Sequence, residues 1–384
     1  MTELKSRERV MITLNHQEPD RVPLDIGGGY STSISIEGYE KLKKYLGYSA
    51  ETKVMSSIFR IAYVDDNVRK QLGSDLHPIT VKSPLHWSPP TSESGTVIDT
   101  WGIKWKQVFY SEGCHYYELV HSPLAEAEID DLDKYPWPDP VDPGYTKGLA
   151  DEVGDLYENT DYALIADSGF KDFWELAYML RGYEQFLIDL KINPQFVSSL
   201  LSKLLEINIA GTTRFLDSVG KYIQVIRTSD DLATQNGLMM SPQTYRKLIK
   251  PVYDTFFKLI KSKTQAKIFY HSCGDVRDLL DDLIEIGVDI INPVQVSAMG
   301  NTAELKTKYG EKLVFWGGID TQHVLPRGTE KEVQNEVKQR IHDLGPGGGY
   351  VAAAVHNMQA DVPPENIVTM AQAVHKFGKY PLTC

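Results

Sequence analysis

The chain has 384 residues, of which 42% are hydrophobic, and this suffices for one large domain or two ordinary ones. Its formal net charge of -12 argues against nucleic acid or an anionic membrane as the main partner, because both favour basic surfaces. The start shows no apolar signal core, no run approaches the roughly 20 apolar residues of a membrane span, and three cysteines are too few for a disulfide framework, so we expect a cytoplasmic protein.

The first third of the chain contains two predicted strands and an insertion. The strands are the short apolar runs at 21–26 and 75–80. Gly27-Gly28-Gly29 lacks the G-x-G-x-x-G spacing of a dinucleotide-binding loop, and we interpret it as a flexible loop. Residues 81–143 alternate like antiparallel strands, as in TVIDTWGIKWKQVF, and end in the Pro-rich DKYPWPDPVDP. This pattern predicts an antiparallel hairpin insertion that caps the active site.

The rest of the chain alternates between short apolar runs and helical stretches. A helix is expected to begin at Ser241-Pro242, because Ser is a good N-cap and Pro suits the first turn, and the last helix at 363–366. With the two early strands, the alternation favours a (β/α)8 TIM barrel, with residues 1–384 as a single domain; a doubly wound open sheet is the alternative. The six predicted strands of this part are 162–166, 222–226, 267–270, 288–293, 313–320 and 349–356.

A histidine and a cysteine follow the predicted strand at 267–270. Because strand side chains alternate with period two, His271 and Cys273 point to the same side of the backbone. His356 ends the last predicted strand and is expected at the same edge of the barrel. The three residues predict a catalytic zinc site with an open fourth position. The alternatives are a core histidine beside a buried cysteine, and a metal-free substrate contact at His356.

Further polar residues stand at the ends of predicted strands. Asp230 and Asp231 are candidates for acid–base catalysis or for supporting the metal ligands, although they could instead cap the next loop. Tyr30, Asn292 and Asp320 are the candidate substrate-binding residues. The 21 tyrosines suit a cavity for a flat or apolar substrate, and they suit ordinary core packing equally well.

Several segments resemble the uroporphyrinogen decarboxylase superfamily over nearly the whole chain: NHQEPDRVP, DDLATQNGLMMSP, FWGGIDTQHVLP and VHNMQADVPPENI. This superfamily has a (β/α)8 barrel and divides into decarboxylases and corrinoid-dependent zinc methyltransferases. Decarboxylases carry an Arg-rich motif after the first strand, where this chain has LDIGGGYSTSIS without an arginine. Zinc methyltransferases carry His-x-Cys at the position of His271 and Cys273. Their third ligand is a cysteine that corresponds to His356, and decarboxylases also tend to have a histidine there.

The resemblance therefore implies a zinc-dependent methyltransferase that moves a methyl group between a small methylated substrate and a corrinoid. The chain has no D-x-H-x-x-G corrinoid-binding motif, so the cobalamin is expected on a separate corrinoid-binding protein. The Tyr- and Trp-rich first third favours a methoxylated aromatic donor, as in an O-demethylase component. One alternative is a metal-free carboxy-lyase that uses Asp230 or Asp231 with His356, and another is a non-catalytic binding protein. A homodimer is among the assemblies that the sequence allows.

Overall fold

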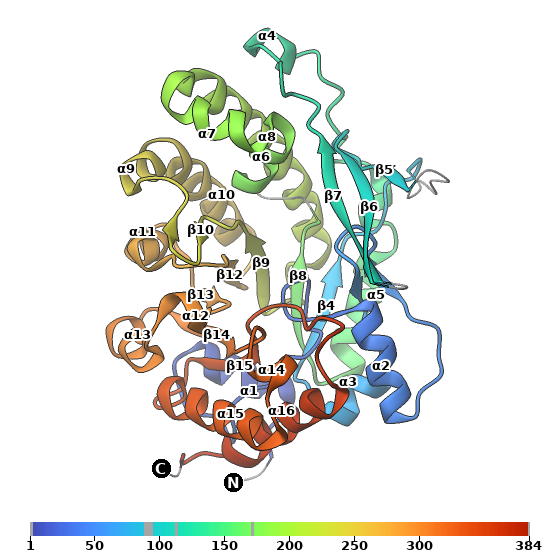
Figure 1. Ribbon diagram of the computed structural model, residues 1–384, viewed down its shortest axis with the longest axis vertical. Helices are drawn as coiled ribbons and strands as arrows, with labels where there is room; N and C mark the ends of the chain where they lie inside the picture. Colours follow the sequence, from blue (N-terminus) through green and yellow to red (C-terminus); the bar gives the residue numbers. More distant parts are fainter. Residues whose placement is uncertain (1–2, 88–94, 112–113, 170–172, 383–384) are drawn as a thin grey trace.

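Seven parallel strands form a curled sheet at the centre of the molecule (Figure 1). The computed structural model describes residues 3–87, 95–111, 114–169 and 173–382, so Cys384 and parts of the predicted insertion lie outside the described residues. In spatial order the strands are β15 (Tyr350–Ala354), β14 (Val314–Ile319), β13 (Ile290–Asn292), β12 (Lys267–His271), β9 (Val225–Ser229), β8 (Ala163–Asp167) and β4 (Leu76–Thr80).

The segment 22–26 occupies the place of the first barrel strand, between β15 and β4. It exchanges two backbone hydrogen bonds with Ala352, from the Asp25 N–H and to the Pro23 carbonyl. On the other side, the Leu24 N–H donates to the side chain of Asp75, and proline has no N–H to offer. The prediction of a regular strand at 21–26 is therefore wrong in form, although the segment completes the (β/α)8 barrel that the sequence predicts.

The later strands lie where the sequence predicts them, apart from β9. The expected strand at 222–226 begins three residues too early, because the Tyr222 N–H still bonds to the Val219 carbonyl in the turn that ends helix α8 (Pro194–Val219). The observed β9 continues to Ser229, which moves Arg227 from the loop into the sheet.

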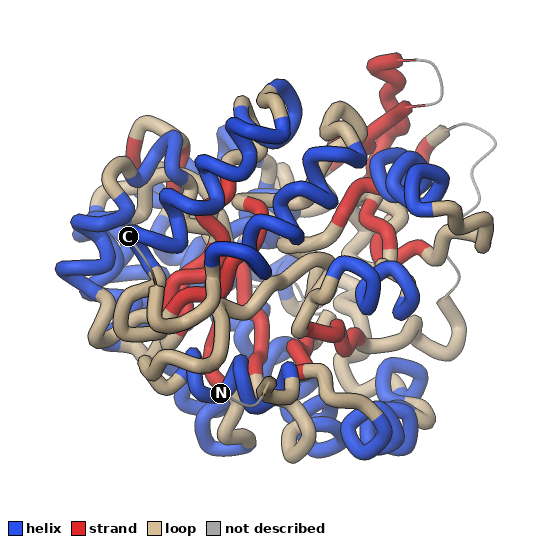
Figure 2. The backbone as a smooth tube through the Cα atoms, turned by 90° about the horizontal axis from the view of Figure 1, so that it is seen from below, coloured by secondary structure: helices blue, strands red, loops and turns tan. Residues whose placement is uncertain are grey.

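Helices follow the strands and cover the outside of the sheet (Figures 1 and 2). The helix predicted at Ser241 begins there, with its hydroxyl accepting from the Thr244 N–H, and it passes through the π-helical turn Tyr245–Ile249. The principal helices are α1 (Ser6–Leu14), α2 (Ile36–Leu46), α3 (Asp66–Leu72), α5 (Leu149–Asn159), α6 (Trp174–Arg181), α7 (Tyr183–Ile192), α8 (Pro194–Val219), α10 (Lys250–Lys263), α11 (Leu280–Glu285), α13 (Thr302–Tyr309), α15 (Glu330–Leu344) and α16 (Pro364–Phe377). Shorter ones are α4 (Ile129–Leu132), η1 (Pro143–Thr146), α9 (Pro242–Thr244), η3 (Arg277–Leu279), α12 (Val296–Met299) and α14 (Val324–Arg327).

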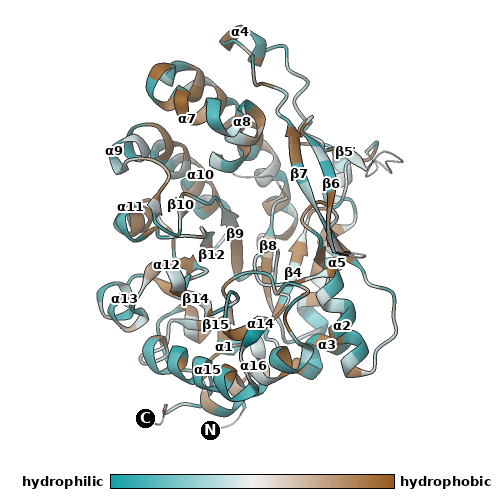
Figure 3. Cartoon of the chain, in the orientation of Figure 1, coloured by the Kyte–Doolittle hydropathy of each residue, from teal (hydrophilic) through white to brown (hydrophobic). Residues whose placement is uncertain are grey.

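The inside of the barrel has its own apolar core, which we call the lumen cluster. It consists of Val10, Leu14, Leu76, Ala163, Ile165, Val225, Phe269, Ile290, Val314, Trp316, Val351 and Ala353. Val10 and Leu14 come from α1, so this helix closes the barrel at the amino ends of the strands. The strands are correspondingly hydrophobic, whereas α13 and α15 are largely hydrophilic on the side drawn in Figure 3. The carboxyl ends of the strands are left for the functional site.

An antiparallel sheet stands between β4 and β8 in the chain, as the insertion at 81–143 predicts. It consists of β5 (Thr96–Ile98), β6 (Lys104–Ser111) and β7 (Cys114–His121), and it projects beside the barrel in Figure 1. Two smaller sheets join β1 (Ile34–Ser35), β3 (Ile61–Ala62) and β2 (Val54–Ser56), and β10 (Ala233–Thr234) with β11 (Gly237–Leu238).

The glycine triplet at 27–29 is packed rather than exposed. All three residues are buried, and a Cβ atom added at Gly27 or Gly28 would lie within 3 Å of the neighbouring side chains of Val64 or Asp25. The interpretation of a flexible loop is therefore wrong, because the chain passes here through a space that only glycine fits. The residues that follow, Tyr30 and Ser31, are held in a defined place.

Candidate metal centre and active-site cavity

Two cavities open at the carboxyl ends of the strands. The large cavity, of about 790 Å³, borders residues from β4, β8, β9 and β12 and from the insertion. The small cavity, of about 320 Å³, borders Cys273 and Asp320, and His356 borders both cavities. The aromatic residues around the large cavity are Tyr30, Phe59, Tyr63, Trp87, Trp101 and Tyr145.

The three predicted metal ligands meet where the two cavities adjoin. One donor atom each of His271, Cys273 and His356 lies within 4.8 Å of the other two. The Cys273 Sγ and the His271 Nε2 are 3.5 Å apart. This agrees with the distance of about 3.6 Å between a sulfur and a nitrogen that bind one tetrahedral zinc ion. Two imidazoles and a thiol within this span fit a zinc ion with a fourth position left open.

Asn292 fixes the orientation of His271. Its Nδ2 donates to the Trp316 carbonyl at 2.9 Å, which settles the direction of the amide group. Its Oδ1 then faces Nδ1 of His271 as a hydrogen-bond acceptor, so the ring proton belongs on Nδ1. The Nε2 lone pair therefore points toward Cys273, in the arrangement that metal-binding histidines usually have.

Burial sets the protonation of the ligands. It lowers the pKa of His271 to about 3 and that of His356 to about 4, so both imidazoles are neutral at neutral pH. Burial and the nearby carboxylate of Asp231 raise the pKa of the Cys273 thiol. A divalent cation at this site would displace the thiol proton, as metal binding to cysteine generally does.

Asp230 supports helix α6. The side chain is fully buried, with 0% exposure. Its carboxylate accepts hydrogen bonds from the backbone N–H groups of Phe173, Trp174 and Glu175 at 2.6–2.7 Å, and also from the Tyr253 hydroxyl. These contacts involve both oxygens, and Asp230 also borders the large cavity. The acid–base role expected for Asp230 stays a prediction.

Asp231 and Glu175 bring acidic groups to the metal centre. Asp231 Oδ1 accepts the Cys273 N–H at 2.7 Å and lies 3.8 Å from His271 Nε2. Glu175 borders the large cavity and accepts a hydrogen bond from the Tyr178 hydroxyl. Burial, with the charges of Asp231 and Asp230, raises the pKa of Glu175 to about 8, so this side chain carries a proton at neutral pH.

The three predicted substrate-binding residues lie in different surroundings. Tyr30 borders the large cavity and donates its hydroxyl to the Met55 carbonyl. Asp320 borders the small cavity, where Oδ1 accepts the backbone N–H groups of Gln322 and His323. Asn292 is fully buried and bonded to His271, so it is placed to orient a metal ligand rather than to touch a substrate.

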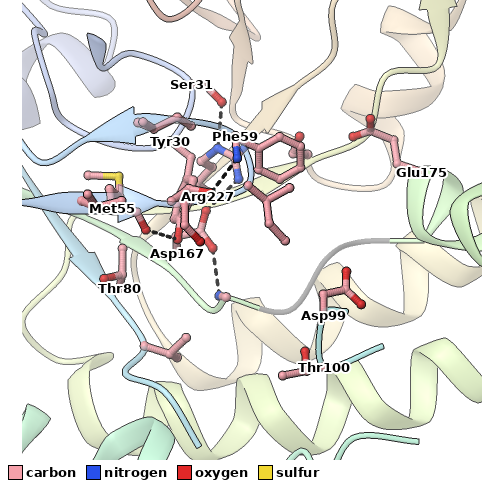
Figure 4. A pocket seen from close by; sticks show the side chains of 18 of the residues that line it. Tyr30, Ser31, Met55, Phe59, Thr80, Asp99, Thr100, Asp167, Glu175 and Arg227 are labelled. Atoms are coloured by element: carbon pink, nitrogen blue, oxygen red, sulfur yellow. Dashed lines mark hydrogen bonds and ion pairs between the residues drawn. The ribbon is translucent and has the colours of Figure 1, made fainter. Parts of the chain in front are cut away.

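Sequence reasoning missed Arg227, Asp167 and Ser31, which form a hydrogen-bonded group in the large cavity (Figure 4). Arg227 was expected just beyond a strand, and the structure includes it in β9. The alternation Val225, Arg227, Ser229 on the inner face of the sheet was the available signal, because an arginine inside an apolar strand is unusual.

Comparisons with known proteins agree with this barrel. A family model described as uroporphyrinogen decarboxylase (URO-D) matches residues 120–377. A uroporphyrinogen decarboxylase of Pseudoalteromonas translucida is 25% identical over 279 residues, which cover 68% of this chain and 73% of that protein. Another, of Actinobacillus succinogenes, is 31% identical over 100 residues, which cover 26% of this chain and 27% of that protein.

A solved structure has the same fold over almost its whole length. It is a methyltransferase from Methanosarcina mazei, with a TM-score of 0.68, 16% identity, and coverage of 98% of this chain and 99% of that one. The match to the family model extends from β7 to the end of α16 and includes His271, Cys273 and His356. The chain belongs to the uroporphyrinogen decarboxylase (URO-D) family.

Proposed function

We propose that the protein is a zinc-dependent methyltransferase, which moves a methyl group between a small methylated substrate and the cobalt of a corrinoid. The convergence of His271, Cys273 and His356 carries this proposal. His271 and His356 both border the large cavity, so a substrate there would be next to the metal. The favoured substrate is a methoxylated aromatic compound, because six aromatic side chains surround that cavity.

In this proposal the residues around the cavity have separate roles. A zinc ion held by the three ligands would act as a Lewis acid toward the oxygen of the methoxyl group. Asn292 keeps Nε2 of His271 directed at the metal. Glu175, protonated at neutral pH because its pKa is raised to about 8, is the group that we expect to give a proton to the departing oxygen. The aromatic walls would exclude water from the reacting atoms.

The other components are proposals as well. The cobalamin would be carried by a separate corrinoid-binding protein, and the methyl transfer would take place in the cytoplasm. Residues of the segment 81–143, among them Asp99, Thr100 and Trp101, border the large cavity, which supports the interpretation of this segment as a cap. Within the described residues, no helix has the length and apolar character to cross a membrane.

A second candidate is a metal-free carboxy-lyase. The two relatives described above are uroporphyrinogen decarboxylases, and Arg227 brings a positive charge to the cavity. Among the described residues around this cavity, Arg227 and Lys82 are the cations, and each pairs with a carboxylate, Asp167 or Glu152. Such a cavity offers little to a substrate with many carboxylates, so we favour the methyltransferase.

Metal analysis of the purified protein tests the zinc site. We expect about one zinc per chain in the wild type, with loss of zinc in Cys273→Ala and His356→Ala while circular dichroism shows a retained fold. His323→Ala, which removes an exposed histidine outside the site, is the matched control and should keep its zinc. A folded wild type that takes up no zinc from supplemented medium would exclude the methyltransferase proposed here.

The activity assay follows the conversion of Co(I) to methyl-Co(III) by absorbance. It uses a panel of methoxylated aromatic compounds and a corrinoid-binding protein as acceptor. Zinc-dependent methylation of cobalt supports the proposal. Release of CO2 from a carboxylated substrate by metal-free protein would favour the carboxy-lyase instead.

A further inference from the structure

Arg227 places a positive charge inside the barrel, beside the large cavity. Its neighbours in register are Asp167 in β8 and Phe269 in β12. Phe269 belongs to the lumen cluster, and partners in register point to the same side of a sheet, so Arg227 also points inward. The side chain of Arg227 is 15% exposed. A charge in such a place needs a partner or a ligand.

Two of the three guanidinium nitrogens are bonded within the protein (Figure 4). Nη1 donates to Asp167 Oδ2 at 2.7 Å, and Nε donates to Ser31 Oγ at 2.9 Å. Asp167 is itself held in place, because its Oδ1 accepts the Gly169 N–H at 2.8 Å. Nη2 has no acceptor among the residues that the structure describes, so a donor of the fixed guanidinium is left for a ligand.

Ser31 supplies a second donor at the same place. Its side chain borders the large cavity, and its oxygen already accepts the Nε–H of Arg227. The hydroxyl hydrogen therefore points elsewhere, and no acceptor for it lies among the described parts of the chain. An Nη2–H and an Oγ–H on one cavity wall suit the two oxygens of a carboxylate.

This pair of donors lies within the length of a small aromatic molecule from the metal centre. Ser229 is in register with His271, and Arg227 precedes it by two residues on the same face of β9. Two residues along a strand span about 7 Å, which is comparable to the length of a substituted benzene ring. The Tyr30 ring lies beside the guanidinium, with 5.8 Å between its centroid and the Arg227 Cζ.

We propose that Arg227 and Ser31 bind a carboxylate group of the substrate, which therefore belongs to the methoxylated aromatic carboxylates. The carboxylate lies against Nη2 and the Ser31 hydroxyl, the ring lies beside Tyr30, and the methoxyl group is directed at His271 and His356. The methoxyl group in this assignment rests on the proposed function, whereas the carboxylate site can be tested without methyl transfer.

The charges around the cavity allow one carboxylate but not several. Asp167 offsets Arg227, and a zinc ion with a cysteine thiolate would offset Asp231. Glu175 is uncharged at neutral pH. The carboxylates of Asp99 and Asp230 also border the cavity, and each already accepts hydrogen bonds within the protein. A single added carboxylate thus meets two donors directed at it, and a second would find no described cation apart from Lys82, which pairs with Glu152.

Direct binding tests the proposal, with 4-methoxybenzoate and its uncharged analogue 4-methoxybenzamide as probes. Calorimetry on the zinc-loaded protein, without a corrinoid, should give a dissociation constant at least about tenfold lower for the benzoate.

Arg227→Met should remove this preference for the benzoate, and Ser31→Ala should reduce it. Lys82→Met, which removes the other cation of the cavity, should keep it. The double variant Arg227→Met/Asp167→Asn leaves neither charge unpaired and replaces Arg227→Met if that variant does not fold.

Two outcomes would overturn the proposal. In the first, the wild type binds both probes equally or binds neither. In the second, the preference survives Arg227→Met, as it would if the carboxylate bound to zinc or to Lys82. Zinc content and methyl transfer, measured on the same preparations, show separately whether the proposed function holds.

Discussion

At the scale of single residues, Asn292 determines which nitrogen of His271 faces Cys273 and the proposed metal site. The amide is locked by the Trp316 carbonyl, and it accepts the proton on Nδ1. Partners of this kind typically contribute 10- to 100-fold to metal affinity, because they hold the ring and fix its tautomer.

We therefore expect Asn292→Ala to bind zinc about 10- to 100-fold more weakly than the wild type. A competition titration with a chromogenic chelator measures the affinity. Asn292→Asp keeps an acceptor for the Nδ1 proton and should recover much of the loss. Equal zinc affinities of the alanine variant and the wild type would show that His271 needs no such partner.

Glu175 makes stability depend on pH. Its pKa is raised from 4.5 to about 8 in the folded protein, by burial and by Asp231 and Asp230. Between these values the folded state holds a proton that the unfolded state has lost, so the free energy of unfolding falls as the pH rises from about 4.5 to about 8.

Glu175→Gln should weaken this dependence, because glutamine has no proton to lose. Denaturant unfolding at pH 6 and pH 9, with a chelator present to remove metal effects, gives the comparison. The variant should lose less stability than the wild type over this interval. Parallel losses would mean that Glu175 ionises as freely in the folded state as in the unfolded one.

Some of these residues could be predicted from the sequence and others could not. His271 and Cys273 were predictable because strand alternation puts them on one side, and His356 because it follows a strand of the same sheet by two residues. Glu175 and Arg227 were not. The raised pKa of Glu175 depends on burial and on Asp231 and Asp230, and Arg227 was placed outside its strand by a three-residue error.

At the scale of elements, the N-terminus of helix α6 is capped by a carboxylate from outside the helix. Asp230 follows β9 and accepts the first backbone N–H groups of α6. Helix N-termini carry such unpaired donors, and an acidic side chain there is stabilising. The helix positions Glu175 at the cavity, so Asp230 links β9 to the active site.

Asp230→Ala should lower the free energy of unfolding by about 3 kcal/mol or more, because it leaves several buried N–H groups unpaired. Asp320→Ala removes similar backbone bonds at a partly exposed position and should cost about 1 kcal/mol. Urea denaturation of both variants measures the difference. Similar losses would indicate that the α6 donors find other acceptors.

The positions of the strands could be predicted from apolar runs in the sequence, but their hydrogen bonding and packing could not. The segment 22–26 has the composition of a strand, yet Pro23 and the side chain of Asp75 replace part of its ladder. The glycine triplet looked like a flexible loop, and the side chains that pack against it come from Val64 and Asp25. Such tertiary contacts cannot be read from local sequence.

At the scale of the whole molecule, the proposed metal centre brings together distant parts of the barrel. His271 ends β12, Cys273 stands two residues later, and His356 follows β15, with β13 and β14 between these strands. A bound ion would therefore connect the carboxyl ends of β12 and β15 across the two strands between them. Because we expect residues 1–384 to form a single domain, we expect a bound ion to stabilise the whole chain.

Zinc should accordingly stabilise the chain by mass action, by about 2.7 kcal/mol when free zinc is 100 times its dissociation constant. Calorimetric melting of chelator-treated protein, with and without added zinc, should show a rise in Tm of several degrees in one transition. Cys273→Ala should show no rise, and His323→Ala should behave as the wild type. A wild-type Tm that zinc leaves unchanged would mean that no ion connects β12 with β15, and melting in two transitions would mean that the chain does not unfold as one domain.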